Sequence, residues 1–206
     1  SRSIGDSKGI TVLDFDDTLA TTKSNVIYKL PNPTHYPGST FVSEENAKLK
    51  VIFMAGPPGS GKSNVIKQLG LSNRFKVVES DIVLQRLIKK AGIPADMKNL
   101  TPKQKKKLQE LMGEANVITG EQERAYQKKG VGVIVDGTGA TKKGLEWQVK
   151  NYQRMGYDVG MIFVEASTDV AIARNKARKE RSLPKSTIEN TRKRVMENKE
   201  AYKKLF

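Results

Sequence analysis

The amino-acid sequence predicts an α/β protein, with a parallel sheet of four to five strands flanked by helices and a helical lid. Three observations lead to this class. Strand-like and helical segments alternate over residues 50 to 206, which is typical of a parallel sheet. A glycine-rich loop separates the first of these strands from its helix. Acidic residues follow the next two strands, at the edge where open α/β sheets bind ligands.

The composition is that of a globular protein of ordinary size. The chain has 206 residues, of which 37% are hydrophobic and 29% charged. No apolar run approaches the roughly 20 residues that span a bilayer, no signal peptide is recognisable, and there is no cysteine. We therefore expect a cytoplasmic protein without membrane association, disulfides or thiolate metal sites. His35 is the single histidine, which excludes a histidine-based triad.

The chain is strongly basic, with a formal net charge of +15. Such a field favours nucleic acid or phosphorylated small molecules as partners. A solvated basic surface without a ligand would have the same composition, and the charge predicts no oligomeric state.

The amino-terminal part is predicted to be separate from the rest. Residues 7–15 form a strand that ends in acidic residues, and residues 31–45 are rich in Pro, Gly, Ser and Thr, as linkers are. We divide the chain into residues 1–45, an amino-terminal strand and linker, and residues 46–206, the main domain.

The first half of the main domain begins with strand and helix in alternation. Residues 49–56 are an apolar run that ends in glycine, and residues 63–70 continue as a helix. Residues 75–80 form a second strand, and Gly92 closes the helix after it. Thr101-Pro102 supplies an N-cap and a first-turn proline. The helix that follows has apolar residues at helical spacing, namely Leu108, Leu111, Met112 and Ala115.

The second half continues the alternation. Residues 131–139 are a third strand, 141–156 a helix and 157–166 a fourth strand. A helix over 167–181 and a last helix from about Lys185 complete the domain.

The glycine-rich loop matches the pattern G-x-x-x-x-G-K-[ST] between a strand and a helix. Such a loop cradles phosphate groups with its backbone N–H groups, so it predicts a P-loop NTPase fold with ATP and Mg²⁺ as cofactors. Lys62 is predicted to reach the β- and γ-phosphates and to be catalytic, and the Ser63 hydroxyl to ligate Mg²⁺. The predicted nucleotide-binding residues of the loop are Gly56, Pro57, Pro58, Gly59, Ser60, Gly61, Lys62 and Ser63.

Two carboxylates stand where the second and third strands end, so both face this loop. Asp81 is placed to accept a proton from an attacking hydroxyl, and Asp136 to order water around Mg²⁺ or to hold the acceptor. Each has an alternative role, because Asp81 suits a helix N-cap and Asp136 suits a turn.

Arg174 and Arg178 are four residues apart, on one face of a helix. Arginines on a flap over the nucleotide would neutralise charge on the transferred phosphoryl group and exclude water. We predict both to be catalytic and to contact ATP. The alternative is a solvated basic helix.

The segments GPPGSGKS, VVESD, IVDGTG and ARNKARKERSLP resemble the kinase domain of phage-type 5′-hydroxyl polynucleotide kinases, over about residues 50 to 205. The related zeta-toxin kinases phosphorylate nucleotide sugars, and their E-G-T motif resembles Asp136-Gly137-Thr138 more than the polynucleotide kinases' D-T-N does. The resemblance implies that Asp81 is the general base for the acceptor hydroxyl, and that Arg174 and Arg178 bind ATP phosphates from a lid.

One position departs from these kinases. They often have a basic residue three positions after the base, where this chain has Leu84, and Arg86 is the nearest substitute. The predicted acceptor-binding residues are therefore Asp81, Arg86, Asp136 and Thr138.

A second phosphate-related motif, D-x-D-x-T, occurs at Asp14, Asp16 and Thr18. It resembles the start of haloacid-dehalogenase-type phosphatases, including the phosphatase half of polynucleotide kinase-phosphatases. About thirty-five residues separate it from the P-loop strand, too few for a second α/β core. We expect a phosphatase-like remnant or a truncated domain, and we expect neither aspartate to be catalytic.

Three functions remain open at this point. The first is ATP-dependent phosphoryl transfer to a hydroxyl, by preference the 5′-hydroxyl of a polynucleotide. The second is a zeta-toxin-like kinase of a nucleotide sugar or another small molecule. The third is a nucleotide-gated module that binds nucleic acid without transfer.

Overall fold

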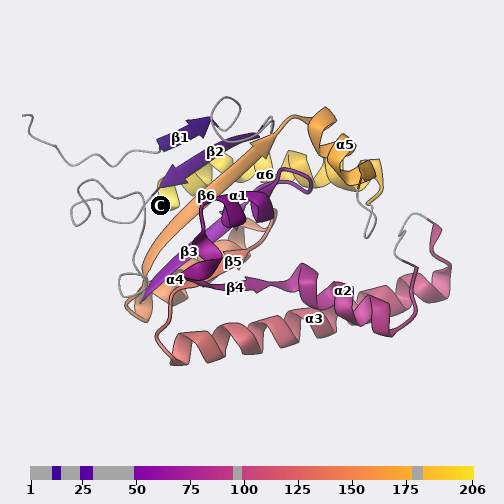
Figure 1. Cartoon of the computed structure of the whole chain (residues 1–206), viewed down its shortest axis with the longest axis horizontal. Helices are drawn as coiled ribbons and strands as arrows, with labels where there is room; N and C mark the ends of the chain where they lie inside the picture. The colour runs from indigo at the N-terminus through magenta and orange to yellow at the C-terminus, as the bar shows by residue number, and fades with distance from the viewer. Residues whose placement is uncertain (1–10, 15–23, 30–48, 95–98, 178–182) are drawn as a thin grey trace, which may run out of the picture.

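The computed structural model describes residues 11–14, 24–29, 49–94, 99–177 and 183–206 (Figure 1). These residues contain a six-stranded sheet with the order β1-β2-β6-β3-β5-β4. Four neighbouring strands are parallel, which confirms the predicted class. They are β3 (Lys50–Ala55), β4 (Lys76–Glu79), β5 (Val133–Asp136) and β6 (Asp158–Ala166).

The helices begin and end close to the predicted positions. The longest has the predicted start, because Thr101 and Gln104 form a capping box in which each side chain accepts the other's backbone N–H. The helices are α1 (Lys62–Gln68), α2 (Ser80–Lys90), α3 (Pro102–Lys128), α4 (Lys142–Arg154), α5 (Thr168–Ala177) and α6 (Lys185–Leu205), with a 3₁₀ turn η3 (Leu71–Asn73) after α1.

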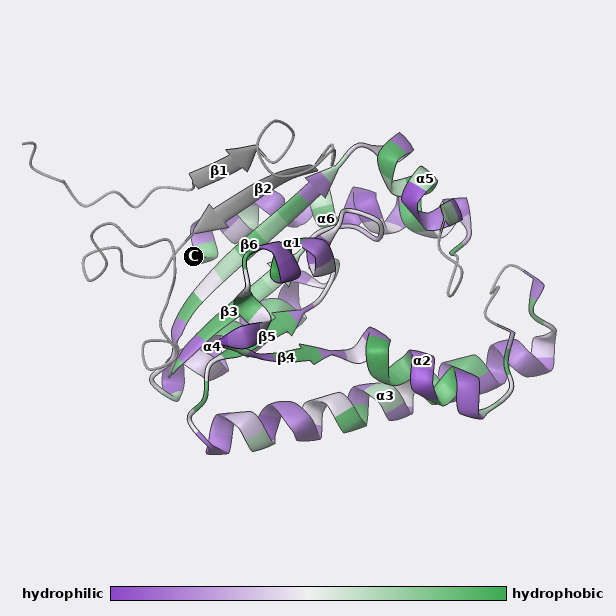
Figure 2. Cartoon of the chain, viewed as in Figure 1, coloured by the Kyte–Doolittle hydropathy of each residue, from purple (hydrophilic) through white to green (hydrophobic). Residues whose placement is uncertain are grey.

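Helices cover both faces of the sheet. Side chains alternate along β3, so Val51 and Phe53 pack with residues of α4 and α6, whereas Ile52 and Met54 pack with residues of α1. Figure 2 shows the result as a hydrophobic band along β3 and β6, with hydrophilic residues on the outer sides of the helices. Coverage on both faces explains why β3 is an unbroken apolar run.

α2 and α3 lie side by side and share a small core of their own (Figure 1). Leu84 belongs to this core, together with Leu111 and Ala115 of α3. The residue at position 84 is therefore apolar because it packs against α3. Met112, which fits the helical spacing, is exposed instead.

Two antiparallel strands extend the sheet beyond β6. β2 (Ser24–Lys29) pairs with β6, and β1 (Thr11–Asp14) pairs with β2. The sequence predicts the strand that ends at Asp14 but not β2. The linker at 31–45 and the rest of the D-x-D-x-T motif lie outside the described residues, so the division at residue 45 and the phosphatase remnant stay predictions.

Across the described segments, no helix is both long enough and apolar enough to cross a membrane.

Candidate nucleotide and acceptor site

The P-loop connects β3 to α1 and lies against two other elements. A Cβ atom added at Gly56 would be 2.2 Å from the carbonyl oxygen of Val164, and one at Gly59 would be 2.6 Å from that of Ala171. Gly59 also has φ +82°, a conformation that side-chain-bearing residues rarely adopt. The loop therefore needs glycine at both positions, and its shape depends on contact with β6 and α5.

The loop after β5 is joined to the P-loop by backbone hydrogen bonds. The N–H of Gly56 donates to the carbonyl oxygen of Thr138 at 3.0 Å, and the N–H of Gly137 donates to that of Met54 at 3.3 Å. The loops that follow the neighbouring strands β3 and β5 therefore continue the hydrogen bonding of those strands. It holds the Asp136-Gly137-Thr138 segment beside the phosphate loop.

A cavity of about 690 Å³ lies over the P-loop at the carboxyl ends of β4 and β5. It brings together residues from five separate parts of the sequence, and its size is within the range of small-molecule sites. The predicted site residues that line it are Pro58, Gly59, Gly61, Lys62, Ser63, Asp81, Asp136, Thr138 and Arg174. Asn64, Glu79, Gln85 and Leu183 also line it, and the sequence analysis does not single them out.

Asp136 lines this cavity with a half-buried carboxyl group. Burial raises the pKa of its carboxyl group, the nearby Lys62 ammonium opposes that rise, and the charge of Asp81 adds to it. Its Oδ1 atom is buried and has no hydrogen-bond partner among the described residues. A buried carboxylate oxygen without a partner is unfavourable, so this atom is placed for a ligand that supplies a donor or a cation.

Asp81 lies in the first turn of α2, and Glu79 occupies the N-cap position. Asp81 is therefore not the N-cap residue of α2, which is the alternative role that the sequence suggests for it. Because Asp81 contributes to the pKa of Asp136, the two carboxylates are close enough to interact through their charges. The residues that follow or end β4 and β5 thus place the carboxylates of Asp81 and Asp136 close together.

Arg174 is anchored to the P-loop. Its Nη1 donates to the carbonyl oxygens of Gly59 at 3.2 Å and of Ser60 at 2.8 Å. The next residue, Asn175, is buried and exchanges two side-chain hydrogen bonds with the backbone of Leu183. These two hydrogen bonds join α5 to the segment just before α6.

Two predicted residues are not among the described residues that line this cavity. Arg178 lies outside the described residues, and its contact with ATP stays a prediction. Arg86 is exposed on α2 and lines neither this cavity nor the one described next.

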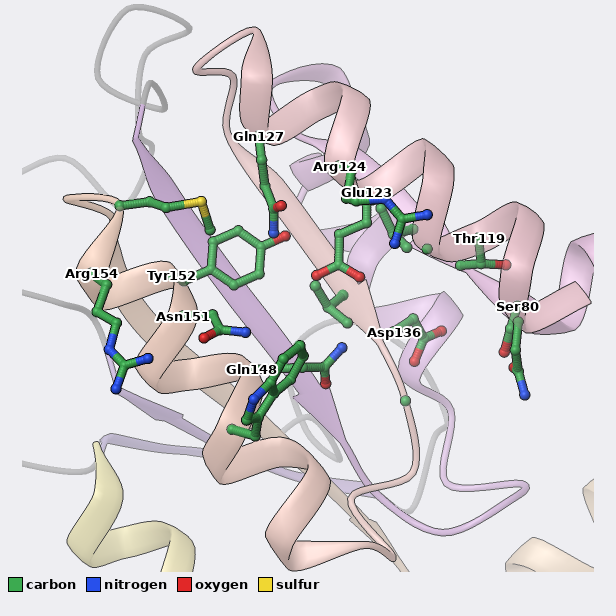
Figure 3. A pocket seen from close by; sticks show the side chains of 17 residues that line it. Ser80, Thr119, Glu123, Arg124, Gln127, Asp136, Gln148, Asn151, Tyr152 and Arg154 are labelled. Carbon is green, nitrogen blue, oxygen red and sulfur yellow. The ribbon is translucent and has the colours of Figure 1, made fainter.

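A second cavity, of about 800 Å³, lies between α3 and α4 (Figure 3). Ser80, Asp136 and Gly137 line both cavities, so the two are adjacent. Glu123, Gln127 and Tyr152 extend into it from the two helices. The sequence pattern does not identify these three residues. They come from α3 and α4, which are separated in the sequence by β5, so they form no local motif.

A family model described as AAA domain matches residues 51–205. The chain belongs to this family. No curated protein matches it. The match covers every element from β3 to α6, including both cavities and the P-loop.

Solved structures resemble this AAA-domain chain in fold. A candidate kinase from Chloroflexus aurantiacus aligns with a TM-score of 0.54 at 16% identity, over 71% of this chain and 76% of its own. The AvrRxo1-ORF1:ORF2 complex with ATP aligns with a TM-score of 0.58 at 13% identity, over 74% of this chain and 48% of its own. The Pnkp1/Rnl/Hen1 RNA repair complex aligns with a TM-score of 0.50 at 22% identity, over 74% and 45%. The chain thus spans about half the length of the last two.

Proposed function

We propose that the chain transfers the γ-phosphoryl group of ATP to a hydroxyl group of an acceptor. The observation that carries this proposal is the meeting of Asp81 and Asp136 with Lys62 in one cavity over the P-loop. A protein that only binds a nucleotide has no need of an acid at Asp81. The similarity in fold to a candidate kinase and to a complex solved with ATP supports the same function.

The residues of the cavity fit ATP and Mg²⁺. Gly56 and Gly59 let the loop pack against the backbone of β6 and α5, where any side chain would clash, and Lys62 donates at 3.0 Å to the Gly56 carbonyl oxygen inside the loop. No group of three or more acidic or histidine side chains gathers at one point in the described part of the chain. Ser63 would hold Mg²⁺ together with phosphate oxygens and water, which is common for this ion, and Oδ1 of Asp136, without a partner among the described residues, is free to order that water. Bound ATP with Mg²⁺ would supply the phosphoryl group and neutralise part of its charge.

The protein's own contribution is to place and deprotonate the acceptor. The acceptor oxygen forms a bond to the γ-phosphorus while the bond from that phosphorus to the β,γ-bridging oxygen breaks. The hydroxyl proton passes to the carboxylate of Asp81, and ADP leaves. Lys62 in the loop and Arg174 beside it offset the charge on the phosphates.

A polynucleotide 5′-hydroxyl is the acceptor we favour. The net charge of +15 suits a polyanion. An exposed group of lysines also lies where α2 ends and α3 begins, one 11-residue helix from Asp81, or about 16 Å. These lysines are Lys89, Lys90, Lys103, Lys105, Lys106 and Lys107. The second cavity favours the alternative of a small-molecule acceptor, because its volume of about 800 Å³ is large enough for one.

The test is incubation with γ-labelled ATP, Mg²⁺ and separate acceptors: 5′-hydroxyl DNA, 5′-hydroxyl RNA and a UDP-sugar. We expect label on an acceptor, and most on an oligonucleotide. Label on the UDP-sugar alone would select the zeta-toxin-like alternative. ATP and oligonucleotide binding with label on no acceptor would contradict transfer and leave the nucleotide-gated binding module.

A further inference from the structure

The cavity between α3 and α4 has the lining of a binding site for an uncharged, hydrogen-bonding group. Its floor is apolar, formed by Val78 of β4 and Val135 of β5. Its walls carry two acids and two arginines, so their formal charges balance, and the remaining polar groups are hydroxyls and carboxamides that both donate and accept. These walls include Asn116, Thr119, Gln127, Gln148 and Asn151.

Tyr152 lines the cavity with a buried, closely packed aromatic ring. It is 1% exposed, and its ring packs edge-on against Phe53 and Tyr157 at centroid distances of 5.8 and 5.0 Å. Its buried hydroxyl has no hydrogen-bond partner among the described residues. Glu123 and Gln127 point toward it from α3 (Figure 3), close enough to change its pKa. A buried hydroxyl beside a carboxyl and a carboxamide can bond to either of them, or to a ligand or water that enters the cavity.

Glu123 is half-buried beside this hydroxyl. Burial raises the pKa of its carboxyl group, while Tyr152 and Arg124 oppose the rise. A half-buried carboxyl next to a tyrosine hydroxyl and a carboxamide makes a compact array of donors and acceptors. Such an array suits the edge of a heterocyclic base.

Trp147 supplies an aromatic surface at the same cavity. It lines the cavity from α4 and is nevertheless 65% exposed. An exposed indole beside a polar cavity offers a face on which a base can stack. It is also the single tryptophan of the chain, so its fluorescence reports on this site alone.

We propose that this cavity binds a nucleoside moiety of the phosphate acceptor, with the base against Trp147 and its hydrogen-bonding edge toward Glu123 and Tyr152. The inference rests on the proposed function, because the cavity shares Ser80, Asp136 and Gly137 with the nucleotide cavity. A polynucleotide 5′ end and a nucleotide sugar both carry such a moiety.

The test uses Trp147 fluorescence with the full chain, without turnover. Adenosine, guanosine, cytidine and uridine, their 3′-phosphates, a UDP-sugar and free glucose are titrated separately. We expect saturable quenching by at least one nucleoside and none by glucose. Glu123→Gln and Tyr152→Phe should each weaken that binding about tenfold or more. The matched controls, Glu121→Gln and Tyr126→Phe, are outside the lining and should bind as the wild type does.

Tighter binding of nucleoside 3′-phosphates points to a polynucleotide end, and tighter binding of the UDP-sugar points to a nucleotide sugar. The proposal is overturned if no nucleoside quenches the Trp147 fluorescence, or if glucose quenches it as strongly as the nucleosides do. The same holds if all four variants bind the nucleoside with the same affinity. It is also overturned if ATP alone causes the quenching that Glu123→Gln removes, because the cavity then holds the base of ATP. Loss of phosphoryl transfer with intact nucleoside quenching would count against the proposed function and not against this site.

Discussion

Replacing Gly59 by alanine is expected to damage the nucleotide site through the packing of α5. The new Cβ atom would lie 2.6 Å from the carbonyl oxygen and 2.9 Å from the Cα atom of Ala171. Both are backbone atoms of a helix, so they cannot move as a flexible side chain would. Either the P-loop or α5 must shift, and Arg174, which donates to the Gly59 carbonyl oxygen, shifts with it.

Gly156 allows the two causes of damage to be separated. Its φ of +81° is nearly the same as the +82° of Gly59, but a Cβ atom at Gly156 would meet nothing within 4 Å. Gly156→Ala therefore measures the backbone strain alone, about 1 kcal/mol. Gly59→Ala adds steric overlap of about 1 to 3 kcal/mol. We expect a total loss of about 2 to 4 kcal/mol in the free energy of unfolding, which is the sum of these two contributions.

Urea unfolding and ATP titration of the two variants form the assay. Gly59→Ala should lose more stability than Gly156→Ala and should bind ATP more weakly, while Gly156→Ala should bind ATP as the wild type does. Equal losses of stability with unchanged ATP affinity in both variants would refute the argument, since the contact between the P-loop and α5 would then be absent.

Three further outcomes are expected. Lys62→Ala should abolish transfer and weaken ATP binding about tenfold or more, because a charge-assisted hydrogen bond to the phosphates is lost. Isothermal titration measures the change in ATP affinity. Lys67 is exposed in the same helix, and Lys67→Ala should change neither transfer nor ATP affinity. Oligonucleotide affinity should fall steeply between about 50 and 200 mM salt, and a flat titration would favour a small-molecule acceptor. The raised pKa of Glu123 means that its contribution to stability is present at low pH and declines as pH rises through the folded-state pKa. Urea unfolding at about pH 4 and 7 should therefore show the wild type losing stability relative to Glu123→Gln at the higher pH, and a constant difference would contradict the burial of this carboxyl. The other titratable or charged side chains that line its cavity are Arg124, Asp136, Tyr152 and Arg154.

Local features of the sequence predict most of the main domain. The start of α3 follows from Thr101, Pro102 and the Gln104 capping interaction, which act within four residues. The P-loop is recognisable because its glycines and Lys62 are contiguous. Asp81 and Asp136 follow from a rule about strand ends, and the structure places both in the cavity.

Features that depend on distant contacts are not predictable in this way. Glu123 and Tyr152 meet only because α3 and α4 pack on the same face of the sheet. Ser24–Lys29 becomes a strand by pairing with β6, more than a hundred residues away. Arg86 is the opposite case, since a suitable residue type near the base turns outward from both cavities.

The central claim, that Asp81 takes the proton of the acceptor hydroxyl, is tested most directly by single-turnover transfer from γ-labelled ATP. The variants are Asp81→Asn and, for comparison, Arg174→Ala, with ATP affinity measured in parallel. Asp81→Asn should slow transfer by about 10² to 10⁴ and leave ATP affinity nearly unchanged, whereas Arg174→Ala should impair the use of ATP with every acceptor. An Asp81→Asn variant that loses ATP binding but transfers at the wild-type rate from the ATP it does bind would contradict the account.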